Sequence, residues 1–334
     1  MTTDGDGSIA VVTGGAGFIG SHLVERLLND GWRVRVLDNL ATGREENLAH
    51  LRHHSGLEWE RVDISRDTRL SAMLAGARWV FHLAGLADIV PSIADPMAYH
   101  RINVDGTVAM LEAARAAGVR RLIYAASSSC YGLTRQLPTP ESAPIAPMYP
   151  YALTKCVGEQ YVIHWARTYR LSALSLRLFN VYGPRSRTSG AYGAVFGVFL
   201  AQKLAGKPFT IVGDGSQSRD FVFVSDVIEA MVRAARAEVS GEAVNIGSGR
   251  ACTINYLVQL LDGPKQNLPK RPGEPECTLA DIGRARRLLD WQPRVSLEDG
   301  VRIMLAQIDY WRAAPVWDSQ AIARATAPWF QWLG

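Results

Sequence analysis

The stretch Thr13-Gly14-Gly15-Ala16-Gly17-Phe18-Ile19-Gly20 decides the fold. The apolar, β-branched run before it, residues 8–13, predicts a strand, and residues 18–29 after it have helical periodicity. Glycines in such a strand-to-helix turn are typical of proteins that bind a dinucleotide pyrophosphate. The helix amino terminus attracts that anion through its free N–H groups and partial positive charge. The stretch therefore predicts the first unit of a dinucleotide-binding sheet.

The glycines of this turn have separate tasks. Gly14 can make the tight turn, Gly17 lets a pyrophosphate approach the backbone, and Gly20 lets the helix pack close to the strand. Their spacing, G-x-x-G-x-x-G, is one residue longer at the front than the usual fingerprint, and a glycine turn without a ligand is the alternative. Asp38, at the end of the second expected strand, would accept hydrogen bonds from an adenosine ribose and repel a 2′-phosphate. NAD is therefore favoured over NADP, although Arg44 nearby argues the other way.

Strands and helices continue to alternate through the first half of the chain. Strands are expected at 33–37, 57–62, 79–83 and 121–126, and helices at 102–117 and 151–169. This order predicts an α/β fold, a doubly wound parallel sheet (Rossmann) with a smaller, mixed α/β C-terminal substrate lobe. The five prolines between 133 and 150 predict a surface loop there.

The domain boundaries follow from where this alternation loosens. Residues 1–180 are expected to form the NAD-binding Rossmann domain, to which the chain returns around 221–246. Residues 181–313 are expected to form most of the substrate-binding lobe. Residues 314–334 are a tryptophan-rich C-terminal tail, expected to pack onto the body.

Composition excludes several classes of protein. The 334 residues are 48% hydrophobic, and a net charge of +4 is too balanced for a protein that mainly binds nucleic acid. The four cysteines lie far apart and form no C-x-x-C pair, so neither a disulfide scaffold nor a metal site is expected. The first residues lack the basic start of a secretion signal, and no stretch predicts a membrane span. We therefore expect a cytoplasmic protein.

The pair Tyr151 and Lys155 is a candidate acid/base site. Residues four apart share one face of a helix, so the lysine charge can lower the pKa of the phenol. Moving that pKa from about 10 to about 7 requires about 4 kcal/mol, which a lysine and an oxidised nicotinamide could supply together in a dry site. An ordinary surface pair is the alternative.

A second candidate is the polar stretch 127–132, which follows the strand expected at 121–126. In a doubly wound sheet, ligands gather at the carboxyl ends of the strands. Ser127 could hold the reacting hydroxyl and Ser128 could assist, whereas a polar loop that caps the strand is the alternative. Cys130 is interpreted as a packing residue, because no partner base is identifiable nearby.

Nine segments occur in an order that resembles the extended short-chain dehydrogenase/reductase family, and within it the nucleotide-sugar (UDP-sugar) 4-epimerases. They are TGGAGFIGSH at 13–22, LDN at 37–39, HLAG at 82–85, SSSCYG at 127–132, YALTK at 151–155, LRLFNVYGPR at 176–185, SRDFVFVSDV at 218–227, NIGSG at 245–249 and KRPGEPECTLAD at 270–281. The resemblance spans about residues 8–312.

The resemblance implies a set of cofactor-binding positions. Gly14, Gly17, Phe18, Ile19 and Gly20 would bind the pyrophosphate of NAD, and Asp38 and Asn39 would bind the adenosine ribose. Asp63 and Ile64 would flank the adenine. Leu83, Ala84 and Gly85 would line the cofactor, and Asn103 would support the site. Tyr151 and Lys155 match the catalytic pair, and Ser127 matches the catalytic hydroxyl.

The resemblance also implies substrate positions. Asn180, Arg219 and Arg271 would bind the substrate diphosphate, and the Thr210–Val212 strand would lie along the uracil. Thr278 falls where relatives limit the sugar's C2 substituent, and its small size would admit an N-acetyl group. Arg187 could pair with a C6 carboxylate, as in UDP-glucuronate, although simple surface exposure explains it as well.

The implied function is inversion of C4 of a UDP-sugar, of the UDP-Glc/Gal or UDP-GlcNAc/GalNAc type, through a transient 4-keto intermediate with NAD. A UDP-glucuronate 4-epimerase is the alternative. A dehydratase would carry an Asp-Glu pair, and a decarboxylase a Glu, where this chain has Ser128 and Ser129. A 4-keto reductase would prefer NADPH, and a non-catalytic NAD-binding protein would not need Tyr151 and Lys155. Relatives pair through the helices at 102–117 and 151–169, so a homodimer is expected.

Overall fold

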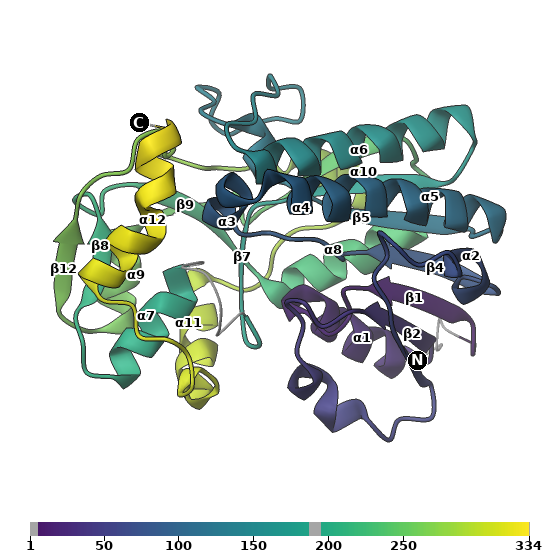
Figure 1. Cartoon of the computed structure of the whole chain (residues 1–334), viewed down its shortest axis with the longest axis horizontal. Helices are drawn as coiled ribbons and strands as arrows, with labels where there is room; N and C mark the ends of the chain where they lie inside the picture. Colours follow the sequence, from purple (N-terminus) through teal and green to yellow (C-terminus); the bar gives the residue numbers. More distant parts are fainter. Residues whose placement is uncertain (1–5, 187–194, 334) are drawn as a thin grey trace.

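The computed structural model describes residues 6–186 and 195–333. Its centre is a seven-stranded, all-parallel sheet in the order β10-β6-β5-β4-β1-β2-β3 (Figure 1). The strands are β1 (Ile9–Thr13), β2 (Arg33–Asp38), β3 (Leu57–Arg61), β4 (Ala77–His82), β5 (Arg121–Ser127), β6 (Ala173–Leu178) and β10 (Glu242–Ile246). The predicted doubly wound parallel sheet is confirmed.

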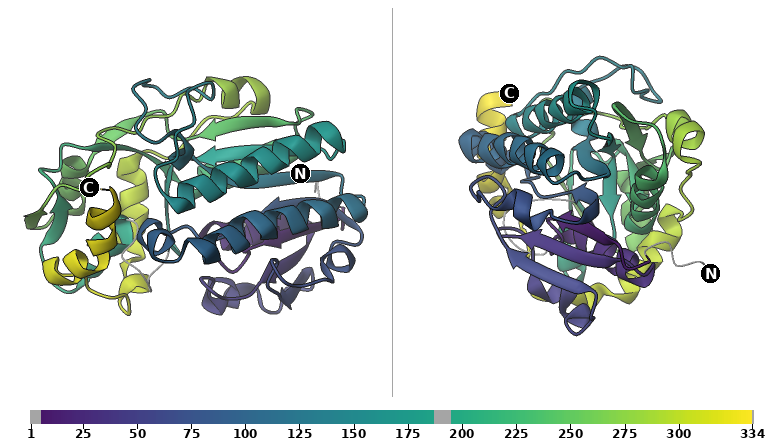
Figure 2. Two further views of the ribbon diagram at one scale, coloured as in Figure 1. Left: turned by 45° about the horizontal axis from the view of Figure 1, so that its top comes forward. Right: turned by 90° about the vertical axis from the view of Figure 1, so that its right-hand side faces the viewer.

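Helices cover both faces of this sheet. On one face lie α2 (Leu70–Met73), α5 (Gly106–Ala116) and α6 (Pro150–Thr168); on the other lie α1 (Phe18–Asn29) and α8 (Val224–Arg236). Figure 2 shows α5 and α6 running side by side over their face. Alternation along the strands explains both layers: Val11 packs in the cluster under α5, whereas its neighbours Ala10 and Val12 pack in the cluster under α1.

The second lobe is smaller and mixed. Its two sheets are β11-β9-β7 and β12-β8, built from β7 (Asn180–Tyr182), β8 (Phe209–Val212), β9 (Ser218–Phe223), β11 (Ala251–Thr253) and β12 (Lys265–Leu268). Its helices are α7 (Val195–Leu204), α9 (Ile254–Leu261), α11 (Leu297–Ala306) and α12 (Ser319–Leu333), whereas α10 (Gly283–Leu289) packs on β10.

Short helical segments complete the chain. They are α3 (Ile89–Ala94), α4 (Pro96–His100), the π-helical turn η2 (Arg101–Asp105) and the 3₁₀ turns η1 (Glu45–Leu51), η3 (Ser128–Tyr131) and η4 (Ile308–Trp311). The helix expected at 102–117 therefore starts earlier, at Pro96, where proline stands in the first turn and Asp95 caps it by accepting from the Ala98 N–H. The helix then widens into a π turn before α5.

Two other expectations differ in detail. The chain returns to the central sheet with α8 and β10, because residues 221–223 belong to β9 in the second lobe. The proline-rich segment 133–149 forms no helix or strand, but it is anchored as well as exposed. Thr139 is buried, its N–H donates to the Leu279 carbonyl at 2.7 Å, and Ala143 is buried too.

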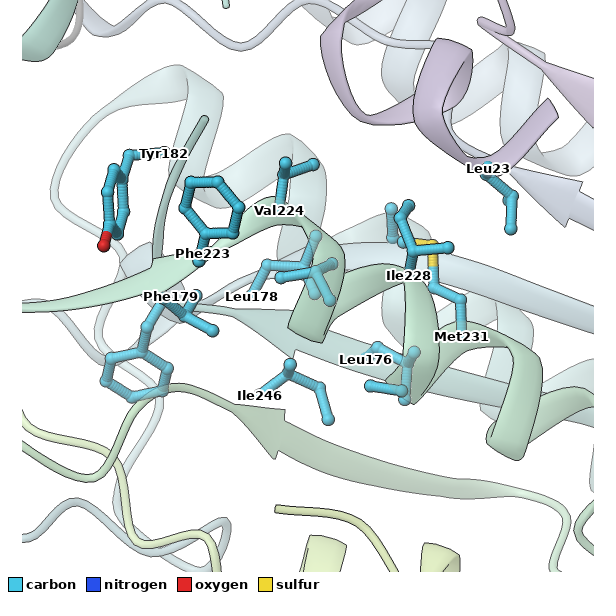
Figure 3. Close-up of a cluster of buried hydrophobic side chains, with 14 of the residues drawn as sticks. Leu23, Leu176, Leu178, Phe179, Tyr182, Phe223, Val224, Ile228, Met231 and Ile246 are labelled. Carbon is cyan, nitrogen blue, oxygen red and sulfur yellow. The ribbon is translucent and has the colours of Figure 1, made fainter. Parts of the chain in front are cut away.

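One hydrophobic cluster joins the two lobes. In Figure 3, Ile228 and Met231 of α8 lie over Leu176 of β6 and Ile246 of β10. The same cluster continues through Phe223, at the end of β9, to side chains of the second lobe. A continuous packed core therefore joins the two lobes that carry the candidate functional side chains.

Among residues 6–186 and 195–333, no helix is both long and apolar enough to cross a bilayer.

The buried core predicts a stability effect at Leu176, which is fully buried in β6. We expect Leu176→Ala to lower the free energy of unfolding by about 3 kcal/mol, because it removes packed methyl groups and leaves a cavity. The same change at Leu133, which is 52% exposed, should stay within about 0.5 kcal/mol. Urea denaturation measures both, and equal effects would contradict this description of the core.

Candidate active site

A cavity of about 680 Å³ opens at the carboxyl ends of the central strands. The glycine turn after β1, Asp38 at the end of β2, Leu83 after β4 and Ser127 at the end of β5 line one part of it. The opposite part is lined by the second lobe, including β8 and Arg219 of β9. Parallel strands end at one edge, so the chain brings residues that lie far apart in sequence into one pocket.

The glycine turn has the geometry that its sequence predicted. Gly14 has φ +68°, and a Cβ on it would lie 2.8 Å from the Ala84 nitrogen. A Cβ on Gly20 would lie 2.1 Å from the Gly14 carbonyl oxygen, so only glycine lets α1 approach this closely. A Cβ on Gly17 would meet just one atom within 4 Å, the Gly14 oxygen at 3.0 Å. Gly17 therefore leaves the amino terminus of α1 open to the cavity.

The Asp38 carboxylate lies in the cavity wall and also organises the loop around it. Its Oδ2 accepts from the Ala16 N–H at 3.0 Å and its Oδ1 from the Leu40 N–H at 2.8 Å. Burial raises the pKa of this carboxyl, while the two N–H donors oppose the shift. Arg44, the cation that argued for NADP, lies with Cζ 5.5 Å from the centre of the Tyr310 ring and Nε 3.5 Å from Glu46.

All the predicted cofactor residues except Asn103 line the cavity. Those that line the cavity are Gly14, Gly17, Phe18, Ile19, Gly20, Asp38, Asn39, Asp63, Ile64, Leu83, Ala84, Gly85, Tyr151 and Lys155. Asn103 lies behind the wall in the π turn η2. Its Oδ1 accepts from the Leu86 N–H at 2.8 Å, and its Nδ2 donates to Thr154 Oγ1 at 3.0 Å. Asn103 therefore joins the loop after β4 to helix α6, which carries Tyr151.

Thr13 and His82 tie the ends of β1 and β4 together. Thr13 Oγ1 accepts from the N–H groups of Leu83 and Ala84, both at 3.1 Å, and lies 2.8 Å from His82 Nδ1. His82 Nε2 lies 3.0 Å from Thr107 Oγ1. Complete burial lowers the pKa of His82 to about 3, so this histidine is a neutral structural link.

Ser127, Tyr151 and Lys155 meet at one end of the cavity. All three line it, and a hydrogen bond joins the Tyr151 and Ser127 side chains. The Lys155 ammonium lies 4.4 Å from the centre of the Tyr124 ring below. Ser128 does not line the cavity and begins the 3₁₀ turn η3, whose Ser129 N–H donates to Ser127 Oγ at 3.2 Å. The assisting role expected of Ser128 has no contact to support it.

Burial shifts both titratable groups of the pair toward their neutral forms. It raises the pKa of Tyr151 to about 12, although the Ser127 hydrogen bond opposes this shift. It lowers the pKa of Lys155 to about 7, although the Glu159 charge opposes that. In the protein alone the phenol is therefore not the acidic group that the sequence suggested, because its own burial disfavours the phenolate.

The Glu159 carboxylate belongs to a buried network beneath the pair. Arg177 Nη2 donates to Glu159 Oε1 at 2.6 Å, and Ser175 Oγ donates to Oε2 at 2.8 Å. Arg177 also donates to the hydroxyl of Tyr131 at 2.7 Å. This network fixes α6 to β6 and keeps one negative charge near Lys155.

The second lobe supplies the cationic side of the cavity. Arg219 and Arg271 line it together with Asn180, Thr210 and Val212. Arg219 Nη2 donates to Glu274 Oε1 at 2.7 Å, so a carboxylate sits where an anionic ligand group would bind. Thr278 does not line the cavity, and its Oγ1 accepts from Asn180 Nδ2 at 3.1 Å and from the Asp220 N–H at 3.2 Å. Its hydroxyl therefore orients Asn180. Arg187 lies outside the described residues.

Several cavity residues were missed from the sequence. They are Asp88, Phe179, Gln217, Glu274, Trp317 and Trp329. Glu274 had a signal, since it lies three residues after Arg271 in KRPGEP, and Asp88 lies three residues after the HLAG segment. The two tryptophans lie in the tail, for which the motifs offered no counterpart.

The sequence also raised the questions of a metal site and of the role of Cys130. The residues that the structure describes contain no group of three or more His, Cys, Asp or Glu side chains that could hold a metal ion. Cys130 is buried, and burial raises the pKa of its thiol to about 12, as expected of a packing residue.

The glycine turn generates a test that separates binding from folding. We expect Gly17→Ala to lower NAD affinity at least about tenfold, or about 1.4 kcal/mol, because its methyl occupies the approach to the helix amino terminus. Gly20→Ala should instead lower the free energy of unfolding by about 3 kcal/mol, because its methyl clashes with backbone. Calorimetric titration with NAD and urea denaturation measure the two effects. Unchanged NAD binding by folded Gly17→Ala protein would contradict the assignment.

The comparisons with known proteins agree with this geometry. Residues 10–247 match the NAD dependent epimerase/dehydratase family. A UDP-glucose 4-epimerase of Mycolicibacterium smegmatis is 40% identical over 301 residues, which cover 87% of this chain and 95% of that protein. The expected family and its NAD cofactor are thereby confirmed.

Two solved structures have the same fold. The UDP-N-acetylglucosamine 4-epimerase of Methanobrevibacter ruminantium M1, in complex with UDP-N-acetylmuramic acid, has a TM-score of 0.84 at 33% identity, covering 90% of this chain and 99% of that one. The UDP-glucuronic acid 4-epimerase of Bacillus cereus, in complex with UDP-glucuronic acid and NAD, has a TM-score of 0.83 at 33% identity, covering 91% and 99%. The chain belongs to the NAD-dependent epimerase/dehydratase family, within the extended short-chain dehydrogenases/reductases.

Proposed function

We propose that this protein is an NAD-dependent UDP-sugar 4-epimerase. The observation that carries the proposal is the shared cavity, in which Ser127, Tyr151 and Lys155 lie between the glycine turn and the two arginines of the second lobe. One pocket thus offers a dinucleotide site, an acid/base group and cations for a diphosphate. A non-catalytic NAD-binding protein would need only the first of these.

The residues present fit NAD. Gly17 leaves an opening at the amino terminus of α1 for the pyrophosphate, and Asp38 presents a carboxylate in the wall for the ribose hydroxyls. Asp63 and Ile64 line the cavity where the adenine would lie. When bound, NAD accepts a hydride from the substrate and returns it, so the net reaction is redox-neutral.

Tyr151 is the acid/base residue of the proposal. Its phenolate takes the proton of the sugar C4 hydroxyl as the hydride leaves C4, which forms a 4-keto sugar and the neutral phenol. The phenol returns the proton when hydride adds to the other face of the carbonyl. Ser127 holds the reacting oxygen, and a positive charge on Lys155 favours the phenolate. Burial alone raises the pKa of Tyr151, and the positive charge that bound NAD would supply in this cavity would lower it.

The second lobe holds the nucleotide while the sugar turns. Arg219 and Arg271 make charge-assisted hydrogen bonds to the diphosphate, and Thr210 and Val212 of β8 lie along the uracil. Tight binding of the nucleotide and loose binding of the sugar let the 4-keto ring present both faces in one site.

The dehydratase and reductase reactions of the family need other side chains at the turn after Ser127 or at Asp38. A dehydratase must move the C5 proton and the C6 hydroxyl, and the turn η3 that follows Ser127 begins with Ser128 and Ser129. A reductase with NADPH needs a site for a 2′-phosphate, where Asp38 stands instead.

The sugar itself is the open part of the proposal. Related enzymes act on UDP-glucose, UDP-N-acetylglucosamine and UDP-glucuronic acid. Thr278 accepts a hydrogen bond from Asn180, which lines the cavity, and its effect on a C2 substituent stays a prediction. A panel of these three UDP-sugars, followed by NMR for an inverted C4 centre, identifies the substrate; no inversion of any of them would contradict the proposal.

We further propose a cytoplasmic homodimer that pairs through α4, α5 and α6. Apolar side chains are exposed on this face, with Met97 73% and Leu153 52% exposed, and α5 and α6 pack against each other. Light scattering tests the dimer, and a monomeric mass would overturn this assembly.

Replacing the acid/base group should abolish turnover but not cofactor binding. We expect Tyr151→Phe to retain NAD and lose at least about a hundredfold in kcat, the usual contribution of a general acid/base. Tyr161→Phe, a matched change on the exposed side of α6, should stay near wild type. Near-normal turnover by Tyr151→Phe would refute the assignment.

The active form of Tyr151 sets the direction of the pH dependence. The phenolate is that form, and its fraction grows with pH, so kcat/KM should rise from about pH 5 and level off only if bound NAD brings the pKa of the buried phenol down from its raised value into the measured range. Initial rates between about pH 5 and about pH 9, with circular dichroism to confirm folding, measure this. A profile that falls throughout this range would contradict a phenolate base.

A further inference from the structure

The C-terminal tail contributes to the wall of the cavity. Ala314, Pro315, Trp317 and Trp329 all line it, although they lie beyond the motifs that identify the family. Figure 1 shows α12 against the second lobe, close to α3. Ile322 and Thr326 on the inner side of α12 are buried, so the helix is packed in place.

Trp329 contacts the loop that carries a predicted diphosphate arginine. Its indole Nε1 donates to the Pro272 carbonyl at 2.7 Å, and the guanidinium carbon of Arg271 lies 5.8 Å from its ring centre. The ring thus contacts one residue through its face and the next residue through its N–H. A cation on an aromatic face is held in a restricted orientation.

Trp329 is also connected to the acid/base residue Tyr151, through the ring of Tyr149. The Tyr149 ring lies 6.0 Å from the Trp329 ring, and it is stacked on Tyr151 with the centres 6.4 Å apart and the planes 8° apart. Trp329 is buried and contacts both Arg271 and Tyr149.

A second tail contact reaches the uracil side. Gln202 Nε2 donates to the Trp317 carbonyl at 2.7 Å and to Thr210 Oγ1 at 2.8 Å, while its Oε1 accepts from the Thr210 N–H at 3.2 Å. One buried side chain therefore connects the start of the tail to β8. The tail therefore contacts the residues expected at the uracil and those expected at the diphosphate.

We propose that four residues of the tail, Ala314, Pro315, Trp317 and Trp329, are part of the substrate site and that Trp329 is a positioning residue for Arg271. Trp329 holds the guanidinium toward the diphosphate and keeps the 271–274 loop in place, so it sets the affinity for UDP and UDP-sugars. The inference rests on the proposed function for the identity of the ligand, and the tail supplies a contact that the family's motifs do not contain.

The test compares variants of the full-length holoenzyme. Titration calorimetry with UDP measures affinity, and steady-state rates with the UDP-sugar found by the panel separate KM from kcat. We expect Trp329→Ala to weaken UDP binding and raise KM about tenfold with kcat nearly unchanged, since it removes binding that is equal in ground and transition states. The matched control is Trp332→Ala, which should behave as wild type. Trp332 lies three residues after Trp329 in α12 and is 67% exposed.

Two further variants show whether the effect passes through Arg271. Trp329→Phe keeps an aromatic face and loses the N–H donor, so it should restore most of the affinity, to within about threefold of wild type. In an Arg271→Ala background, Trp329→Ala should cause little further loss, because residues that act as a unit are not additive. Fully additive losses would overturn the positioning role.

The outcomes separate this inference from the proposed function. A wild-type protein that binds no UDP would overturn the function itself. A wild-type protein that binds UDP, with folded Trp329→Ala protein of unchanged affinity, would overturn only the role of the tail. If Trp329→Ala does not fold, Trp329→Phe decides. A loss of about threefold that disappears in the Arg271→Ala background would support the inference. A loss of equal size in both backgrounds, or no loss in either, would overturn it.

Discussion

The close approach of α1 to the turn after β1 is the constraint on which the rest of the structure depends. A side chain at Gly20 would overlap the Gly14 carbonyl, so a methyl group there would push the helix off the sheet. Thr13 then links this turn to the end of β4, and Asn103 links the loop after β4 to α6. Through these contacts the position of Tyr151 follows from the position of a glycine more than a hundred residues earlier.

The second constraint is the core that the two lobes share. Side chains of α8 pack on the central sheet, and the same cluster extends into the second lobe, so a continuous core joins the lobes that carry the arginines and the tyrosine of one cavity. This arrangement separates two requirements of an epimerase. In the proposed reaction, charges on one lobe would hold the nucleotide, while the reacting carbon would lie at the acid/base residue of the other.

Local chemistry explains which features could be predicted from the sequence. Sequence patterns among near neighbours indicate the order of strands, the glycine turn and the Tyr151–Lys155 pair. The rule that ligands bind at the carboxyl ends of parallel strands indicates the role of Asp38. The sign of the Tyr151 pKa shift depends on burial by distant elements, and Trp329 enters the cavity only because α12 folds back over it. Thr278 matched a family position, yet its hydroxyl contacts Asn180 rather than the cavity, which only coordinates reveal.

The central claim is that the hydride removed from C4 returns to C4 within one cavity. Its most direct test uses the UDP-sugar that the protein inverts, labelled with deuterium at C4, and follows the product by NMR. The account predicts that C4 inverts with the deuterium retained, because the label never exchanges with water. Inversion with loss of the deuterium to solvent would contradict it.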